Sequence, residues 1–513
     1  MIINLEDYFS KGDKWLYDTL SVEKREVFPP NYKLNIFYTQ DHFNNDLAVG
    51  KALSRLQEYL VLLDIPNFFV AIHTNKQDIS TDLNTVKNIF APNDVEISYI
   101  FINGIFDKTV INTKSICILP WIHLHINSQG QIGTCCQFDD HYQLGHVSHD
   151  NLKEVVNGEQ MKLVRKQMIN GQRPSICNNC WKQEDYNMIS ARQQVNSVYA
   201  KYLGLVEQTS SDGSFTNFKL RSFDFRTSNV CNLKCRMCGG KYSSRIAQEE
   251  IDLYPSMHTD RNFVELKLNS AEIQNVLDFF KDSINDLESI YFAGGEPLIM
   301  AEHYKILDFL IQSDRTNVIL TYNTNLSTLK YKNVQVLDYW KQFLNVEILA
   351  SIDLIGDRAS YVRSGVEYRI LEENYLAIRD HVIFRIDSTL TIYNSFNLID
   401  LQQHWIKNFN IPANNFNIRI SMLPPEIMSI RVLPKYYKDL VSKKIHEHIE
   451  WLSNINDSTS LVTRWQDVLY FMNSDDQSHL LKDFFRLNDD KDRIRNERFE
   501  DVFPEYRDLR SYV

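Results

Sequence analysis

The sequence predicts an α/β protein organised around a partial, TIM-like (β/α)6 barrel. Candidate strands alternate with helical patterns between residues 218 and 423, and such alternation favours a parallel sheet with right-handed crossovers. The length of 513 residues predicts about three or four domains, and a hydrophobic content of 43% is ample for large cores. Sheets of this kind place their chemistry at the carboxyl ends of the strands.

The six candidate strands of the barrel are short runs rich in β-branched and aromatic residues. They span residues 222–228, 289–296, 317–325, 345–353, 383–393 and 416–423. Helical patterns lie between them, for example at residues 269–283 and 398–409.

Residues 1–112 predict a smaller α/β domain that could dock a substrate. Strands are expected at 34–39, 68–74 and 96–102, with helices at 47–64 and 81–90. The first of these helices has apolar residues at three- and four-residue steps, which make one buried stripe. These residues are Leu53, Leu56, Leu60 and Leu63.

The region from residue 424 to 513 predicts a helical, charged extension. A proline-broken loop at 424–438 leads into a helix, and a final helix is expected at 499–510. We expect this extension to cover the barrel and to take no part in catalysis.

All eight cysteines lie between Cys117 and Cys238. The N-terminal residues show no signal peptide, and the best apolar window, at 59–72, is too short and too interrupted to span a membrane. A cytoplasmic chain with clustered cysteines points to a metal or to catalysis, and not to disulfides. The net charge of −11 disfavours a dominant nucleic-acid role.

Three cysteines, Cys231, Cys235 and Cys238, follow the first barrel strand with the spacing C-x3-C-x2-C. Structural zinc and cubane clusters normally take four protein ligands, so three thiolates would leave one iron of a 4Fe–4S cluster open to a small molecule. The second strand ends in Gly-Gly-Glu-Pro at 294–297. Its bare backbone can approach a ligand, and its carboxylate suits an amino group. A zinc knuckle or packing cysteines are the alternatives, which this strand context disfavours.

These two motifs together resemble the radical S-adenosylmethionine (radical SAM) superfamily, over roughly 200 residues. The resemblance implies that Cys231, Cys235 and Cys238 hold a 4Fe–4S cluster whose fourth iron is chelated by the methionine moiety of S-adenosylmethionine. Met237 takes the place of the hydrophobic, usually aromatic, residue near the adenine, because a thioether can also pack on an aromatic ring.

The resemblance also assigns further residues to S-adenosylmethionine. Glu296, with the backbone of Gly294 and Gly295, would bind the methionyl amino group. Ser351 resembles a ribose-contacting serine, Arg363 an arginine that pairs with the methionyl carboxylate, and Asn325 a further strand-end ligand. The alternative is that Ser351 and Asn325 cap strand ends and that Arg363 is a solvated charge on a helix.

The other five cysteines form a second pattern. Cys117 precedes a hairpin signal with a turn at Ser128–Gly130, Cys135 and Cys136 follow it, and Cys177 and Cys180 form a C-x2-C loop. Four thiolates from a hairpin and such a loop make a closed site that suits either zinc or a 4Fe–4S cluster.

This second pattern is similar to the SPASM/twitch module of radical SAM enzymes, which holds an auxiliary 4Fe–4S cluster. The resemblance implies the one-cluster twitch form at residues 113–200. Its ligands would be Cys117, Cys135, Cys177 and Cys180, with Cys136 as the alternative to Cys135. In most relatives the module follows the barrel, whereas in this sequence the module comes before the barrel.

The resemblance implies two 4Fe–4S clusters, bound S-adenosylmethionine and a low-potential electron donor of the flavodoxin or ferredoxin type. The expected reaction is reductive cleavage to a 5′-deoxyadenosyl radical that abstracts a hydrogen from the substrate, with the auxiliary cluster as electron acceptor or relay. The substrate is expected to be a peptide or protein side chain. The alternatives are oxidation of a small molecule such as a sugar alcohol, and, from another class, a non-catalytic iron–sulfur or zinc binding module.

Overall fold

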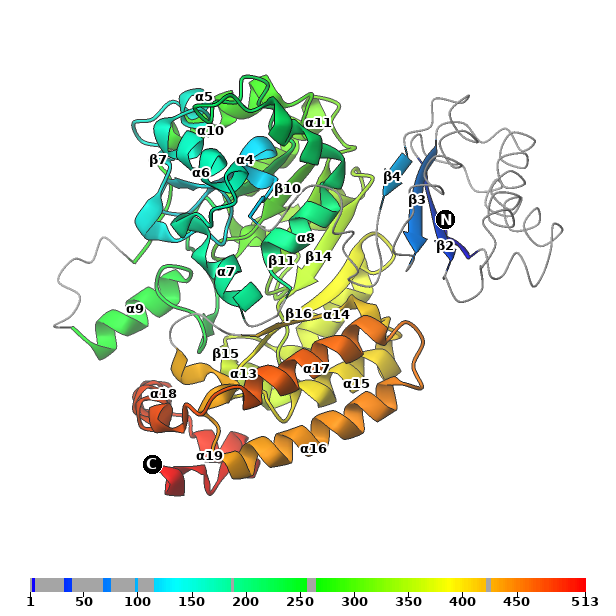
Figure 1. The fold of residues 1–513 in the computed structure, drawn as a ribbon. Helices are drawn as coiled ribbons and strands as arrows, with labels where there is room; N and C mark the ends of the chain where they lie inside the picture. Colours follow the sequence, from blue (N-terminus) through cyan, green and yellow to red (C-terminus); the bar gives the residue numbers. More distant parts are fainter. Residues whose placement is uncertain are drawn as a thin grey trace. The chain divides into compact units, whose positions relative to one another are not determined.

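The chain folds into two units, each with its own mainly parallel sheet (Figure 1). The first unit comprises Met1–Ile118, Gln167–Gln172 and Ile189–Thr209, and the second comprises Leu119–Lys166, Arg173–Met188 and Ser210–Val513. This computed structural model describes residues 2–4, 32–38, 68–74, 97–99, 115–185, 189–255, 264–420 and 426–513.

The first unit contains a four-stranded parallel sheet in the order β1-β2-β3-β4. The strands are β1 Ile2–Asn4, β2 Tyr32–Tyr38, β3 Phe68–Thr74 and β4 Ile97–Tyr99. The three strands expected here are therefore confirmed, and β1 is additional. The helices expected at 47–64 and 81–90 lie outside the described residues. Helix α8 (Ala191–Val198), which begins with a capping box at Ser190, also belongs to this unit.

The second unit contains a nine-stranded sheet in the order β17-β16-β14-β11-β10-β8-β5-β6-β7. All six strands predicted for the barrel region are present and parallel: β8 Ser222–Phe225, β10 Ser289–Phe292, β11 Ile319–Thr324, β14 Val346–Ala350, β16 Ile383–Leu390 and β17 Phe416–Ile420. The described strands pair in a row that ends at β17 and β7. The parallel α/β sheet is thus confirmed, and the barrel classification stays a prediction.

Helices connect the parallel strands. They are α10 Ser270–Ser283, α11 Ala301–Gln312, α12 Val336–Trp340, α13 Gly356–Val362, α14 Tyr368–Ile378 and α15 Leu398–Phe409. The helices predicted at 269–283 and 398–409 are therefore confirmed. Helix α10 begins where the Asn269 side chain accepts hydrogen bonds from two backbone N–H groups and Glu272 completes the capping box.

The segment before the barrel extends the same sheet. Strand β5 (His123–Ile126) pairs in parallel with β8, and β6 (Gln131–Gly133) and β7 (Gly145–His146) continue antiparallel. The predicted hairpin is thus present, and helix α4 (Leu119–Ile122) ends directly before its first strand. Helices α5 (Leu152–Val155), α6 (Glu159–Ile169) and α7 (Asn178–Asp185) follow.

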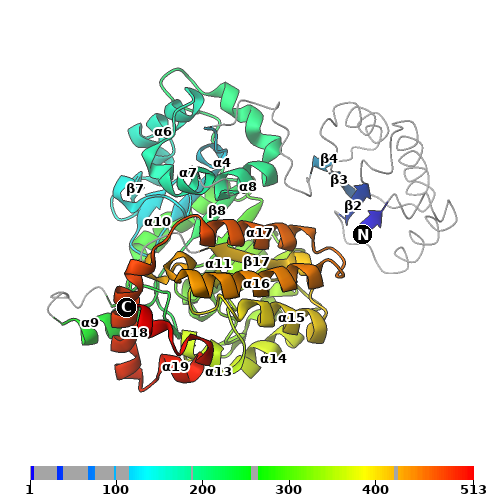
Figure 2. The same cartoon turned by 60° about the horizontal axis from the view of Figure 1, so that its bottom comes forward.

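The C-terminal region is helical, as expected. Its helices are α16 Lys435–Leu452, α17 Thr459–Asn473, α18 Leu481–Arg495 and α19 Phe499–Val502. The final helix predicted at 499–510 is interrupted at Pro504, which starts a separate 3-10 turn. Figures 1 and 2 both show α15, α16 and α17 side by side.

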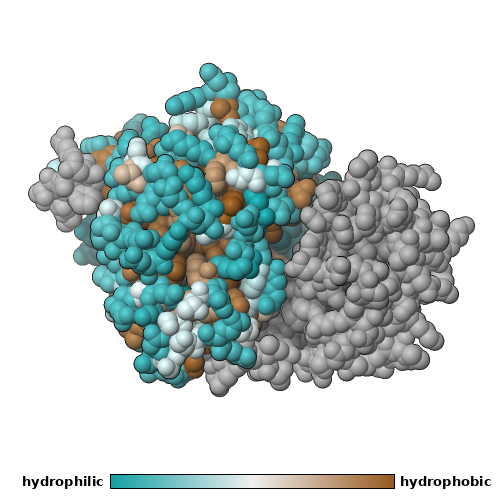
Figure 3. All heavy atoms as spheres, turned by 90° about the horizontal axis from the view of Figure 1, so that it is seen from above, coloured by the Kyte–Doolittle hydropathy of each residue, from teal (hydrophilic) through white to brown (hydrophobic). Residues whose placement is uncertain are grey.

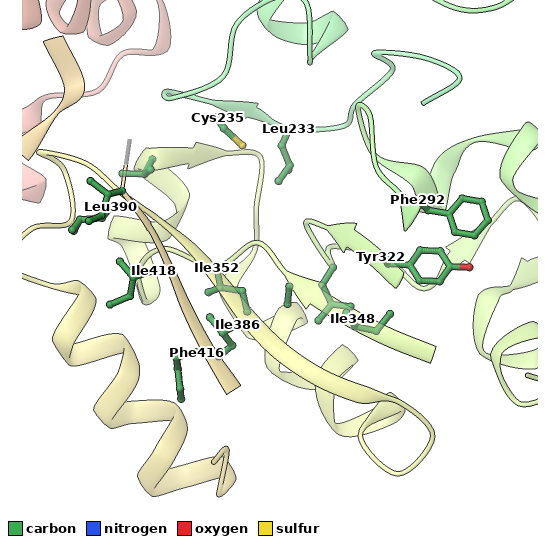
Figure 4. Close-up of a cluster of buried hydrophobic side chains, with 14 of the residues drawn as sticks. Leu233, Cys235, Phe292, Tyr322, Ile348, Ile352, Ile386, Leu390, Phe416 and Ile418 are labelled. Carbon is green, nitrogen blue, oxygen red and sulfur yellow. The ribbon is translucent and has the colours of Figure 1, made fainter. Parts of the chain in front are cut away.

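The two faces of the large sheet differ in chemistry. One face is apolar, because the register aligns Phe225 with Phe292 and Tyr322 with Ile348 on neighbouring strands, and all four side chains belong to the buried core. Figure 4 shows Phe292, Tyr322 and Ile348 in this core. The described surface is largely hydrophilic, with hydrophobic residues in scattered patches (Figure 3). Of the helices that the structure describes, none combines the length and the apolar character that a membrane span requires.

Candidate functional site

The cysteine loop begins directly after β8, at the carboxyl end of the parallel strands. Its short strand β9 (Lys234–Cys235) pairs antiparallel with β15 (Arg363–Ser364), which sets Cys235 opposite Arg363. Leu233, fully buried, anchors the loop in the core together with Cys235 (Figure 4). The loop is therefore fixed up to and including its second cysteine.

The three thiols of this loop converge. The thiols of Cys235 and Cys238 share a hydrogen bond, and Cys231 lies close enough to both to interact electrostatically. The hydrogen bond from Cys238 lowers the pKa of Cys235, and the charge of Arg363 acts in the same direction against the effect of burial. Burial raises the pKa of Cys231 to about 12.

Arg363 lies inside this site and not on a solvated helix face. Its Nη1 lies 3.6 Å from Cys235 Sγ, and its Nε donates to Asp353 Oδ2 at 2.7 Å. Burial lowers the pKa of Arg363, but the adjacent Asp353 carboxylate outweighs it and keeps the guanidinium charged. A cation thus lies against the thiols, where it stabilises their thiolate forms.

The Gly-Gly-Glu turn lies against the backbone that leads into the cysteine loop. The N–H of Gly295 donates to the Ser228 carbonyl at 3.0 Å, and the N–H of Glu296 donates to the Val230 carbonyl at 2.8 Å. A Cβ on Gly295 would lie 2.1 Å from the Val230 carbonyl oxygen. Gly294 has a φ of +126°, a conformation open to glycine. Both glycines are therefore needed for this close approach.

Glu296 is 1% exposed, and its carboxylate is already hydrogen-bonded within the protein. Oε1 accepts from Thr324 Oγ1 at 2.6 Å and from Leu298 N at 3.1 Å, and Oε2 accepts from Asn325 N at 2.7 Å. A carboxylate offers about four acceptor positions, so about one remains. Burial raises its pKa to about 7 despite these bonds.

The other residues assigned to S-adenosylmethionine also lie at this edge. The amide nitrogen of Asn325 donates to Asn232 Oδ1 at 2.9 Å and lies 4.0 Å from Cys231 Sγ. The Ser351 hydroxyl donates to Asn323 Oδ1 at 2.7 Å. Met237 is half-buried against the core. The structure thus brings the first cysteine set, the Gly-Gly-Glu turn, Asn325 and Arg363 together.

The donor set fits an iron–sulfur cluster with one open site. Three thiols from one loop supply soft ligands, and a cation lies beside them. Among the described residues, no three His, Cys, Asp or Glu side chains are grouped as the ligands of one metal ion would be. Each thiolate of a cubane binds a different iron, so cluster ligands do not need to meet at one point.

The second set of cysteines is divided between the two units. Cys117 is buried in the first unit, and Cys135, Cys177 and Cys180 belong to the second. Within the second unit, the segment after Cys135 lies along the C-x2-C segment, because Asp139 N donates to the Ile176 carbonyl at 2.9 Å. The Asn179 amide donates to the Gln137 carbonyl at 3.0 Å.

The histidines near the second cysteine set contact other groups of the protein. His123 lies 3.0 Å from the Ser222 hydroxyl, His125 lies 3.1 Å from Asp224, and His146 lies 2.7 Å from the Gln129 carbonyl. Cys136 is exposed, and its thiol interacts electrostatically with Asp224 and Arg226 on β8 and the residue after it.

Sequence reasoning missed a set of charged and polar residues on the second face of the sheet. They share this face because neighbouring parallel strands are in register and side chains alternate. They are His125, Asp224, Arg226, Tyr291, Asn323, Glu347, Arg385, Asp387 and Arg419. The signal that could have found them is the alternation of polar residues in each strand, as at Asp224 and Arg226 around Phe225.

Sequence reasoning also missed a contact between the cysteine loop and the C-terminal helix α18. Arg236, between the second and third cysteines, is fully buried. It donates to Asn488, Asp492 and Glu497 at 2.8, 2.5 and 2.6 Å. Lys491 donates to the Arg236 carbonyl at 3.0 Å. The extension therefore does more than cover the sheet, because it holds the backbone that carries the cysteines.

Residues 117–181 match the family of the SPASM iron–sulfur cluster-binding domain. No curated protein matches the chain. The match confirms the prediction of an iron–sulfur module in this segment and favours iron–sulfur over zinc. Domains of this kind are typical of radical SAM enzymes, so the chain resembles that class of enzyme through this segment.

Proposed function

We propose that the chain is a radical SAM enzyme. The observation that carries the proposal is the convergence of Cys231, Cys235 and Cys238, from one loop at the carboxyl end of a parallel sheet, beside the Gly-Gly-Glu turn. The match to an iron–sulfur domain in residues 117–181 supports it independently. When bound, a reduced 4Fe–4S cluster with S-adenosylmethionine supplies a 5′-deoxyadenosyl radical that abstracts a hydrogen atom.

The residues around the thiols divide the binding task. Cys231, Cys235 and Cys238 hold the cluster, and the charge of Arg363 favours their thiolate forms while its guanidinium offers a donor to the methionyl carboxylate. The remaining acceptor position of Glu296, together with the backbone of Gly294 and Gly295, binds the methionyl ammonium. Ser351 and Asn325 orient the ribose, and Met237 packs near the adenine.

The second cysteine set holds an auxiliary 4Fe–4S cluster through Cys117, Cys135, Cys177 and Cys180. The interaction of Cys136 with charged residues of the sheet supports Cys135 as the ligand. An external low-potential donor of the flavodoxin or ferredoxin type supplies electrons in the cytoplasm.

The substrate is a peptide or protein side chain, with a small polar molecule as the second candidate. The polar second face of the sheet suits either of them and does not suit an apolar substrate. A non-catalytic iron–sulfur or zinc binding module is disfavoured, because three thiols leave one cluster position open and the Gly-Gly-Glu turn, which suits a small-molecule ligand, packs against the same loop.

Metal content tests the assignment of both sites. Anaerobically reconstituted protein should bind about eight irons, and the Cys231→Ala/Cys235→Ala/Cys238→Ala variant about four. Cys135→Ala should also lose about four irons, whereas Cys136→Ala should keep the full number. About four irons with one zinc in the parent protein would contradict the auxiliary cluster, and equal iron in the triple variant and the parent would contradict the first site.

A further inference from the structure

Two arginines and two aspartates occupy the carboxyl end of the polar sheet face. Arg226, the residue after β8, donates through Nε and Nη2 to the two oxygens of Asp224, both at 3.1 Å. Arg419 on β17 donates through Nε to Asp387 on β16, at 2.7 and 2.8 Å. Each arginine is therefore held in place by a buried carboxylate.

The two arginines face a common space. Tyr291 on β10 and the Cys136 thiol each interact electrostatically with both guanidiniums. The guanidinium of Arg226 lies 6.0 Å from the centre of the Tyr291 ring. Tyr291 is aligned with Asp224 in the sheet register, so it lies on the same face. The guanidiniums of Arg226 and Arg419 therefore both lie within electrostatic range of Tyr291 on β10.

Arg419 keeps the binding end of its guanidinium available. Its side chain is 51% exposed although Nε is bound to Asp387. Among the described residues, its Nη1 and Nη2 have no hydrogen-bond partner. Two parallel N–H groups on a guanidinium that is already oriented match a planar oxyanion.

A chain of hydrogen bonds joins this arginine to the residue that the proposed function sets against the ribose. Ser351 donates to Asn323, Asn323 donates to Asp387 at 3.0 Å, and Asp387 accepts from Arg419. Arg419 therefore belongs to the same hydrogen-bond network as Ser351, through Asn323 and Asp387.

We propose that Arg419, with Arg226 across the same face, binds a carboxylate group of the substrate. This proposal rests on the radical SAM assignment and specifies its substrate class as a carboxylate-bearing molecule. The group carries one negative charge, because each arginine already pairs with one buried aspartate, so that a dianion would place more negative charge beside these two carboxylates.

The test uses the reconstituted full-length protein with S-adenosylmethionine and a small carboxylate probe. N-acetylglycine carries the carboxylate, and N-acetylglycinamide is its neutral counterpart. Saturation-transfer NMR under anaerobic conditions should detect binding of N-acetylglycine and no binding of N-acetylglycinamide. Arg419→Gln should weaken N-acetylglycine binding about tenfold or more, since two charge-assisted hydrogen bonds are lost. Arg419→Lys keeps the charge but not the two parallel N–H groups, so its affinity for N-acetylglycine should lie between that of the parent protein and that of Arg419→Gln.

Arg385→Gln is the matched control. Arg385 pairs with Glu347 at 2.6 Å in the same kind of ion pair on the same face, but it lies in the first half of β16, and its Nη1 donates to the Asn414 carbonyl at 3.4 Å, before β17 begins. This variant should bind N-acetylglycine as the parent does. Comparison of N-acetylglycine with the α-amide of N-acetylaspartate then separates a chain-terminal carboxylate from an acidic side chain.

Three results would overturn the carboxylate site. They are equal binding of the acid and the amide, equal weakening in Arg419→Gln and Arg385→Gln, and preference of the site for inorganic phosphate. No binding of either probe would overturn it as well. Formation of 5′-deoxyadenosine is measured in the same samples. If the protein forms 5′-deoxyadenosine but does not bind the probe, only the carboxylate site is refuted. If it binds the probe through Arg419 but forms no 5′-deoxyadenosine, only the radical SAM assignment is refuted.

Discussion

The buried ion pair between Arg236 and Asp492 gives the sharpest test of how the cysteine loop is held. Arg236 is fully buried, and Asp492 also accepts from the Tyr361 hydroxyl at 2.8 Å and from Phe499 N at 2.9 Å. Asp492→Ala leaves this guanidinium with only part of its acceptors. Removal of one partner of a buried pair costs about 3–5 kcal/mol. Because Glu497 remains at 2.6 Å, we expect the lower end of this range.

Hydrogen exchange measures this cost locally, without requiring that the two units unfold together. The Arg236 amide donates to the Val362 carbonyl at 2.7 Å, so it reports on opening of the loop. A cost of about 3 kcal/mol corresponds to exchange that is faster by about a hundredfold or more. The measurement uses the chain without iron, because a cluster would itself protect the loop.

Asp483→Ala is the matched control on the same helix. Asp483 pairs with Arg486 at 3.2 Å across one helical turn, and both side chains are exposed. Such a pair contributes about 0–1 kcal/mol, so exchange in the cysteine loop should stay unchanged. If Asp492→Ala also left the Arg236 amide as protected as in the parent protein, α18 would have no role in holding the loop.

Three further perturbations separate the parts of the site. Gly295→Ala should prevent assembly of the cysteine loop, because its Cβ would lie 2.1 Å from the Val230 carbonyl oxygen; full iron content in this variant would contradict the packing. Glu296→Gln should weaken S-adenosylmethionine binding about tenfold or more and reduce stability, because an amide NH2 must face the N–H of Leu298 or Asn325; calorimetry with unchanged affinity would exclude its role in binding. Burial lowers the pKa of His448 to about 3, so the unfolded chain binds the proton first as the pH falls below about 6.5, and stability is lost. Between pH 7 and pH 5 the free energy of unfolding should fall by about 2 kcal/mol for one such group. Urea unfolding curves of His448→Gln should lack this part of the pH dependence, and an identical pH dependence in both proteins would refute the lowered pKa of His448.

The parallel strands and their connecting helices could be predicted because each is specified locally. β-branched and aromatic runs alternate with amphipathic patterns, and Asn269 with Glu272 marks a helix start within four residues. The cysteine loop and the Gly-Gly-Glu turn were also predictable, since both follow strands that end at the same edge of the sheet.

The remaining features depend on contacts between distant segments. The pairing of β5 with β8 joins residues about a hundred positions apart, so no local pattern indicates that the hairpin extends the sheet. Arg236 meets Asp492 across 256 positions. Glu296 was expected to be available to a ligand, whereas its bonds to Thr324, Leu298 and Asn325 use most of its acceptor positions, because β11 ends beside it.

Formation of 5′-deoxyadenosine is the direct test of the proposal that the protein cleaves S-adenosylmethionine reductively. Reconstituted protein is incubated anaerobically with S-adenosylmethionine and dithionite, and the products are quantified by mass spectrometry. We expect 5′-deoxyadenosine and methionine from the parent protein, and neither from the Cys231→Ala/Cys235→Ala/Cys238→Ala variant, which should keep its fold because the loop lies outside the nine-stranded sheet. Absence of 5′-deoxyadenosine from a parent protein that carries its full iron content, or equal amounts from the triple variant, would contradict this proposal.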